Sequence, residues 1–377
     1  MAQNLPLPIQ TMYAELVERC SMDRLIADFP VSGSFFTKTA NGRNYWYFRS
    51  GTDEHGKRRD RYVGPDTPEL QQQILKHRQA KASFRERRMM LTSLQRTGLR
   101  GPDARTGRIL EALADAGVFR LRAVVVGTAA YQTYSGLLGV LLANRNAMTD
   151  DLDLAQFPSI SIAVGDQVHL PFGDILKEVD PRFEAVPHPI DGRHATHYAI
   201  GNEFRVDILA PNRGPDDETP VALPALQVEA QPLRFLDFLI YQEVKAVVLY
   251  GGGIAINVPA PERYALHKLI VSRMRIKTEQ SQAKALKDLR QAGELLGVLV
   301  EQRPYELQDL WTEMRERGPK WRRMAEEAVG LLDWATGTPE IRERFLSTVG
   351  AHDEAPSPAN KKDTALDDPS DAGGMEP

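Results

Sequence analysis

The chain has 377 residues, of which 42% are hydrophobic and 26% charged, and its net charge is −4. This composition is typical of a globular protein in water, and the length predicts two or three domains. The single cysteine, Cys20, excludes an intramolecular disulfide framework and a cysteine-rich zinc site. No apolar run is long enough to span a bilayer. Because the N-terminus also lacks the pattern of a signal peptide, we expect a cytoplasmic protein that makes no membrane contact.

Charge is unevenly distributed along the chain. Residues 38–108 contain 17 basic and 7 acidic side chains, a net charge of +10. Residues 350–377 contain 7 acidic and 2 basic side chains and almost no large apolar residue. Such a segment cannot bury enough surface to offset the entropy lost on ordering, so we expect it to be a disordered acidic tail.

The N-terminal third is predicted to contain a small sheet between helices. Residues 11–28 have apolar positions at helical spacing. Aromatic runs separated by Asn-Gly and glycine turn signals then predict a three-stranded antiparallel sheet at residues 35–36, 45–48 and 62–63. Thr67-Pro68-Glu69 is a helix start, with Thr67 as N-cap, and the basic helix that follows extends to about Leu94. A short amphipathic helix is expected at 105–116.

From Val118 onward the pattern is that of an α/β core followed by helices. Apolar or alternating runs predict strands at 121–126, 151–157, 183–186, 197–200 and 204–209, and a hairpin at 245–250 and 254–258. Helices are expected from Thr128 to about 142, within 159–179, and near 260–275, 278–301, 304–317, 320–334 and 338–348. The fold class we predict is therefore α/β (α+β) with a mixed sheet.

Three aspartates fall on two of the predicted strands. Asp151 and Asp153 are two residues apart, so their carboxylates project from the same face. Asp207 lies between Val206 and Ile208 on a separate apolar strand. An aspartate-x-aspartate pair is by itself more often a solvated turn than a metal site. A neighbouring strand that adds a third carboxylate would create an all-oxygen site suited to Mg²⁺, and two metals there fit in-line phosphoryl transfer.

The junction at Gly127-Thr128 supports the phosphate interpretation. Both residues follow an apolar strand and precede a helix. Glycine permits close approach of the backbone, the N-terminus of the helix offers N–H groups to phosphate, and the threonine hydroxyl can donate to the same phosphates. Taken alone, the pair could equally be an ordinary strand-to-helix turn.

Gly127-Thr128, Asp151-Leu152-Asp153 and Asp207 together resemble the nucleotidyltransferase superfamily that includes DNA polymerase beta. Thr128 stands where serine is usual, and the gap to Asp151 is longer than in compact members. Residues 258–269 and the run Lys284-x-x-Lys287-Asp288-Leu289 resemble bacterial nucleotidyltransferase-like proteins, which include toxin-type enzymes of toxin–antitoxin modules. The resemblance covers residues 118–300 and excludes both the basic segment and the acidic tail.

The resemblance implies transfer of a nucleoside monophosphate from an NTP, with release of pyrophosphate. Asp151 and Asp153 would bind both Mg²⁺ ions, or Mn²⁺ in their place, and Asp207 would complete the metal that activates the acceptor hydroxyl. Gly127 and Thr128 would hold the β- and γ-phosphates. Lys268, with Ser272 one turn later, is either a triphosphate contact or a surface lysine with its stem on apolar neighbours.

Other polar residues of the predicted core are expected to be structural or solvent-exposed rather than catalytic. We expect Lys284, Lys287 and Asp288 to form a salt-bridged helical face. Arg205 is placed on the side of its strand opposite Asp207 and given a structural role. The three histidines that follow Pro187 are expected to be solvated residues of a hairpin loop; they are His188, His194 and His197.

The basic segment carries interleaved aromatic residues, a combination that favours contact with a polynucleotide over a merely solvated charged helix. The cations expected to contact nucleic acid are Lys57, Arg58, Arg59, Arg61, Arg85 and Arg88. The predicted organisation is a basic extension with a small β-sheet and a long helix (1–100), a nucleotidyltransferase core (101–258), a helical domain (259–349) and the tail (350–377).

The function predicted from all these features is Mg²⁺-dependent nucleotidyl transfer to a hydroxyl of RNA, such as a tRNA end. A toxin-type enzyme with an antitoxin-like protein partner is included in that prediction. One alternative is an enzyme that nucleotidylates a protein or a small molecule. Another is a non-catalytic nucleic-acid-binding regulatory protein on the same fold.

Overall fold

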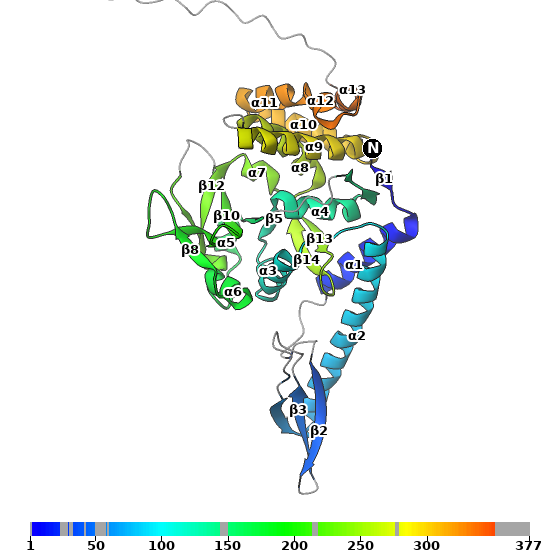
Figure 1. The fold of residues 1–377 in the computed structure, drawn as a ribbon, viewed down its shortest axis with the longest axis vertical. Helices are drawn as coiled ribbons and strands as arrows, with labels where there is room; N and C mark the ends of the chain where they lie inside the picture. The colour runs from blue at the N-terminus through cyan, green and yellow to red at the C-terminus, as the bar shows by residue number, and fades with distance from the viewer. Residues whose placement is uncertain are drawn as a thin grey trace, which may run out of the picture.

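A computed structural model describes residues 2–22, 29, 33–40, 43–49, 58, 60–143, 150–212, 218–275 and 279–350. The predicted acidic tail beyond residue 350 lies outside them. In Figure 1 a body of sheet and helices is covered on one side by a layer of helices, and a narrow arm projects from the other side. Within the described residues no helix has the length and apolar character needed to cross a membrane.

The body is built on a seven-stranded mixed sheet. Strands β11, β12, β10, β7 and β5 follow one another in that order, and β9 also pairs with β10 and with β8. The pairs β10–β12 and β10–β7 are parallel, whereas β5 is antiparallel to β7. The strands are β5 (Val124–Val126), β7 (Asp151–Ala155), β8 (Glu184–Pro187), β9 (Ala195–Ile200), β10 (Phe204–Asn212), β11 (Val221–Leu223) and β12 (Val228–Arg234).

Short helices connect these strands and cover the sheet. They are α3 (Ala104–Asp115), α4 (Gly127–Leu137), α5 (Pro158–Ala163), α6 (Phe172–Val179), α7 (Leu236–Leu239) and the 3₁₀ turn Pro224–Leu226. The strand predicted at 121–126 begins only at Val124, because Arg122 adopts a φ of 68° that no regular strand accommodates. The sequence analysis did not predict β11 or β12, and Pro232 inside β12 is unusual for a paired strand.

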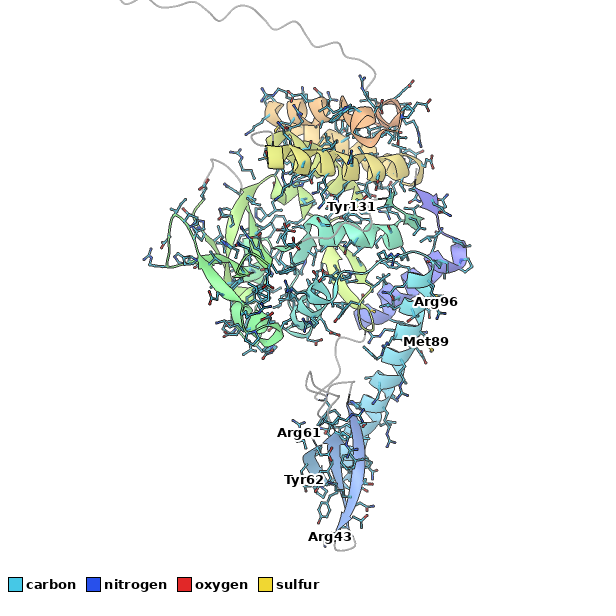
Figure 2. The ribbon with its side chains drawn as sticks, in the orientation of Figure 1. Arg43, Arg61, Tyr62, Met89, Arg96 and Tyr131 are labelled. Carbon is cyan, nitrogen blue, oxygen red and sulfur yellow. The ribbon has the colours of Figure 1, made fainter. Side chains whose placement is uncertain are left out.

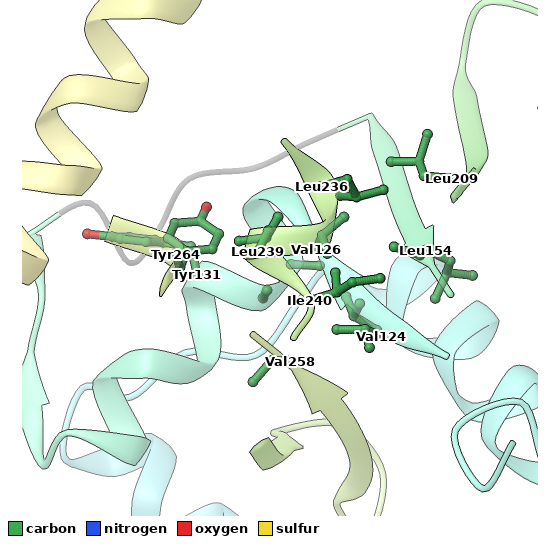
Figure 3. Close-up of a cluster of buried hydrophobic side chains, with 14 of the residues drawn as sticks. Val124, Val126, Tyr131, Leu154, Leu209, Leu236, Leu239, Ile240, Val258 and Tyr264 are labelled. Atoms are coloured by element: carbon green, nitrogen blue, oxygen red, sulfur yellow. The ribbon is translucent and has the colours of Figure 1, made fainter. Parts of the chain in front are cut away.

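The main core lies between the seven-stranded sheet and the helices that pack on it. Val124, Val126 and Leu154 come from β5 and β7, and Leu236 and Leu239 come from α7 (Figure 3). All are buried. Val124 and Val126 belong to a continuous apolar strand, whereas in β7 the buried Leu152 and Leu154 alternate with Asp151 and Asp153.

A hairpin and a helical layer complete the body. The predicted hairpin is confirmed as β13 (Val244–Val248) and β14 (Ile254–Val258), which pair antiparallel. The helical layer (top of Figure 1) is formed mainly by α8 (Pro261–Met274), α9 (Glu279–Gln302), α10 (Pro304–Glu316), α11 (Pro319–Val329), α12 (Leu332–Thr336) and α13 (Ile341–Thr348). The single helix expected at 320–334 is therefore two helices, separated near Gly330.

The arm consists of a three-stranded antiparallel sheet and the first part of a long helix (Figure 1). The strands are β2 (Ser34–Ala40), β3 (Arg43–Arg49) and β4 (Asp60–Pro65), and the helix is α2 (Pro68–Arg96). Both predictions are confirmed, including the N-cap, because the Thr67 hydroxyl accepts a hydrogen bond from the Leu70 N–H at 3.3 Å. The predicted turns at Asn41-Gly42, Gly51 and Gly56 lie outside the described residues.

The first helix belongs to the body rather than to the arm. Helix α1 (Leu7–Met22) buries Tyr13 and Leu16 against Leu94, at the end of α2, and against β13. The Tyr13 hydroxyl donates to the Val247 carbonyl at 3.1 Å. Ahead of it, the short strands β1 (Gln3–Asn4) and β6 (Val140–Leu141) pair with each other. The grouping of residues 1–100 as one extension is corrected accordingly, because only the part from β2 to the middle of α2 stands apart.

Candidate active site

Strand pairing brings the three aspartates together. In the parallel ladder between β7 and β10, Asp153 is opposite Asp207, and Asp151 is opposite Arg205. On its other side Asp153 is opposite Val126, the last residue of β5. The register therefore brings the three aspartates to neighbouring positions on β7 and β10, near the end of β5, where α4 begins.

Gly127 is fitted closely against this cluster. Its φ is 66°, a left-handed conformation that favours glycine, and a Cβ at this position would lie 2.5 Å from Oδ2 of Asp153. The Tyr264 hydroxyl donates to the Gly127 carbonyl at 2.9 Å and thereby holds the junction from α8. The first N–H groups of α4 thus begin directly beside the aspartates.

Like charge dominates the electrostatics of the cluster. Burial, with the neighbouring charges of Asp151 and Asp207, raises the pKa of Asp153 to about 7. Burial also raises the pKa of Asp207, although Arg205 opposes this rise. Asp151 is exposed. Two neighbouring carboxylates with raised pKa values are a site where a bound cation would relieve both repulsion and desolvation.

Arg205 lies on the same side of β10 as Asp207, which corrects our placement of it. Its Nε donates to Oδ1 of Asp207 at 2.6 Å. Residues two apart on a strand share a face, and this periodicity, applied to Arg205, would have predicted the contact. Arg205 is exposed and also lines the pocket described next, so its role is not confined to structure.

A pocket of about 720 Å³ opens beside the aspartates. One wall is polar and includes Gly127, Asp153, Asp207 and Lys268. The lining also includes apolar side chains from β10, β12, α7 and α8; these are Leu209, Leu233, Leu236, Leu239, Val271 and Met274. A charged end with an apolar wall suits a molecule that carries both phosphates and a flat base.

Helices α8 and α9 supply cations to the polar wall. Nζ of Lys268 is 2.5 Å from Oδ1 of Asp288, and Nη1 of Arg275 is 3.5 Å from the other oxygen of that carboxylate. Nζ of Lys287 donates to the Thr128 hydroxyl at 3.0 Å. The predicted salt-bridged face of α9 is confirmed for Asp288, but its partners are on α8, and Asp288 is buried and Lys287 half-buried at the site. Only the resemblance of this run to known nucleotidyltransferase-like proteins could have indicated it.

Ser272 does not contact the pocket. Its side chain is buried, and its hydroxyl donates to the Leu269 carbonyl at 2.7 Å inside α8. The predicted phosphate contact by Ser272 is therefore corrected. The spacing that placed it one turn after Lys268 is right, but that turn carries the hydroxyl into the helix packing.

The histidines are also placed differently from our expectation. His188 is buried, with Nε2 2.7 Å from Oε1 of Gln231, and His194 contacts Glu229. His197 lies on β9 opposite Asp207 and lines the pocket. Burial and the nearby Arg205 lower its pKa. His188 and His194 lie in the predicted loop between β8 and β9, although His188 is buried and His194 is half-buried. His197 lies on a strand instead, and the register between β9 and β10, which no local signal predicted, decides its place.

The donor set fits a hard divalent cation, since three carboxylates supply oxygen ligands only. In the described part of the chain, however, no three histidine, cysteine, aspartate or glutamate side chains already converge as a metal site requires. Asp207 is directed towards Arg205 instead. The residues are suited to a metal, and the side chain of Asp207 would have to turn from Arg205 to join its ligands.

The predicted nucleic-acid contacts that the structure describes lie in and beside the arm sheet and in the second half of α2, distant in the sequence from the aspartates. Arg85 and Arg88 are exposed on α2, and Arg61 of β4 places its guanidinium 4.9 Å from the ring centroid of Phe29. Arg58 is exposed. Lys57 and Arg59 lie outside the described residues.

Comparison with known proteins places the site in a family. The model of a nucleotidyltransferase family matches residues 104–316, and that of a domain of unknown function matches residues 8–72. No curated protein matches the chain. A solved structure, an antigenic nucleotidyltransferase-like protein from Paracoccidioides brasiliensis, shares 12% identity with it over 60% of this chain and 95% of its own, with a TM-score of 0.28. Because the first model covers more than half of the chain and contains the aspartate pocket, the chain belongs to the nucleotidyltransferase family.

Proposed function

We propose that this protein transfers a nucleoside monophosphate from an NTP to a hydroxyl group of RNA in a reaction that requires Mg²⁺. The observation that supports the chemistry best is the juxtaposition of Asp151, Asp153 and Asp207 beside the Gly127 turn. Family membership establishes nucleotidyl transfer in general. The metal and the acceptor are proposed from the residues.

The chain's own groups would hold the nucleotide by its phosphates. The N-terminus of α4 offers N–H groups, and the Thr128 hydroxyl and Lys287 stand beside it. Lys268 and Arg275 add positive charge from α8. This arrangement places cations where negative charge develops, and catalysis would come from positioning and charge neutralisation.

The metal ions would be held by Asp151, Asp153 and Asp207. When bound, Mg²⁺ would supply Lewis-acid polarisation of the phosphates and of the acceptor hydroxyl. The acceptor oxygen would bond to the α-phosphorus while the bond to the β-phosphate breaks and pyrophosphate leaves. Asp207, whose pKa is raised by burial, would take the hydroxyl proton.

The charge of the N-terminal segment favours RNA as the acceptor. Residues 38–108 carry a net charge of +10, whereas the whole chain carries −4. A polyanion would be attracted to this segment over a wide range of approach directions. A small-molecule acceptor would need no such surface.

The test is a labelling reaction with each α-³²P-labelled NTP, total RNA and purified protein, in Mg²⁺ or in EDTA. We expect label in RNA, only with Mg²⁺, and none with Asp153→Asn. Label in protein bands alone would overturn the RNA acceptor while retaining the transferase. No label in any fraction would contradict catalysis and favour a binding protein.

A further inference from the structure

The three-stranded sheet of the arm has two different faces. One face carries Phe35 and Phe48, which pack at 5.0 Å on each other and at 5.1 and 5.6 Å on the ring of His77 from α2. These rings form a small core under the sheet. The residues next to them in β2 and β3 point the other way.

The outward face carries four aromatic rings from all three strands, Phe36, Tyr45, Tyr47 and Tyr62, which we call the aromatic face. Phe36 and Tyr47 are stacked, with centroids 5.7 Å apart and planes at 27°. Tyr62 lies 5.5 Å from Tyr47 and 6.3 Å from Tyr45. Tyr62 is 53% exposed and projects from the sheet at the end of the arm (Figure 2). Phe36, Tyr45 and Tyr47 are half-buried and Tyr62 is exposed, so these rings are not enclosed as a second core.

Cations surround the aromatic face. Nζ of Lys38 is 4.5 Å from the centroid of Tyr47, and the guanidinium of Arg49 is 4.7 Å from that of Phe36. Arg43 lies near the tip of the arm (Figure 2). The described residues between 33 and 100 include 13 basic and 4 acidic side chains. One of the acids, Asp60, is already paired with Arg49.

We propose that the aromatic face binds unpaired bases of a single-stranded RNA segment. Rings offer stacking surfaces to any base, and the surrounding cations attract the phosphates between them. One exposed and three half-buried rings with cations beside them complement a polyanion that has flat apolar groups. The choice of RNA rests on the proposed function, in which RNA is the acceptor.

The position of the aromatic face separates it from the reacting hydroxyl. The sheet packs on the first part of α2, where Leu70, Ile74 and His77 are buried, whereas Leu91 and Leu94 are buried in the body. The 29 residues of α2 span ~44 Å at 1.5 Å per residue. The face therefore anchors one part of an RNA, while another part, tens of ångströms away, reaches the pocket.

The experiment measures fluorescence anisotropy of a labelled, unstructured 12-nucleotide RNA with the full-length protein, in EDTA and without NTP. We expect the double variant Tyr47→Ala/Tyr62→Ala to bind at least tenfold more weakly than the wild type. Tyr62→Phe, which keeps the ring, should bind as the wild type does. Tyr305→Ala, at a 77% exposed tyrosine of α10, is the matched control and should have no effect.

Unchanged binding by the double variant, when circular dichroism shows it folded, would overturn the proposal. If that variant is unfolded, Tyr62→Ala alone at its exposed position decides the question by the same criterion. Tighter binding of the matching single-stranded DNA would overturn the choice of RNA. Asp153→Asn should bind the oligonucleotide as the wild type does, because the aromatic face lies apart from the pocket. A wild type that binds the oligonucleotide but labels no RNA would count against the proposed function and not against the aromatic face.

Discussion

Asp153 makes the stability of the metal-free protein depend on pH. Folding raises its pKa from 3.8 to about 7, so between these values the folded state binds more protons than the unfolded state. The free energy of unfolding should therefore fall as pH rises from 4 to 7 and level off above 7. The rise in pKa corresponds to about 4 kcal/mol as an upper limit. Urea unfolding in EDTA should show this fall in the wild type and a much smaller one in Asp153→Asn, which should be the more stable at pH 8. Equal pH profiles would contradict the burial of the carboxylate.

Lys287 is expected to act through the Thr128 hydroxyl that it contacts at 3.0 Å. Lys287→Gln should weaken NTP binding by about 10- to 100-fold, because a hydrogen bond to a charged group contributes about 1.5–3 kcal/mol. Lys284→Gln, at an exposed lysine on the same helix, is the matched control. Calorimetric titration with a non-hydrolysable NTP measures the affinity of Lys287→Gln and of Lys284→Gln. Similar affinities for both variants would remove Lys287 from the site.

At the level of elements, the β5–α4 junction positions the aspartates because Gly127 leaves room for Asp153. Gly127→Ala adds a methyl 2.5 Å from Oδ2 of Asp153 in a left-handed conformation. We expect at least a 100-fold loss of transfer and a stability loss of about 1–3 kcal/mol. Gly165→Ala is the control, since Gly165 has a φ of 61° and open space around it. Gly165→Ala should lower the free energy of unfolding without reducing the rate of transfer. Initial rates of transfer and urea unfolding measure the two effects. Equal transfer rates for Gly127→Ala and the wild type would contradict the steric argument.

At the level of the whole molecule, the cations of the arm and of α2 should give RNA binding a strong salt dependence. Charge reversal is a cleaner test than removal of residues 1–100, which would also remove Tyr13 and Leu94 from the body core. Arg85→Glu/Arg88→Glu should weaken RNA binding and make the slope of log affinity against log salt less negative by about 2. Arg323→Glu/Arg342→Glu, at exposed arginines of the helical layer, should leave the slope unchanged. If Arg85→Glu/Arg88→Glu leaves the slope of log affinity against log salt unchanged, the RNA binds elsewhere.

The sequence by itself determined the pieces whose signals are local. The aromatic runs predicted the arm strands, Thr67-Pro68 predicted the start of α2, and the alternation around Asp151 and Asp153 placed both on one strand. The Gly127-Thr128 turn was predicted because a strand, a glycine and a helix follow one another within a few residues. The family followed from these motifs and is confirmed by the family model.

Only the tertiary structure decided which side chains surround the aspartates. The register of β9 on β10 brings His197 opposite Asp207, and the packing of α9 on α8 brings Asp288 to Lys268. Such contacts join residues distant in the chain, and a local pattern does not specify strand register or helix rotation across that distance. Ser272 shows the converse, because helical spacing placed it near the site while packing directed its hydroxyl to the Leu269 carbonyl. Local periodicity indicates most of the elements, although not β11 or β12, and the burial of apolar faces against one another determines which polar groups meet.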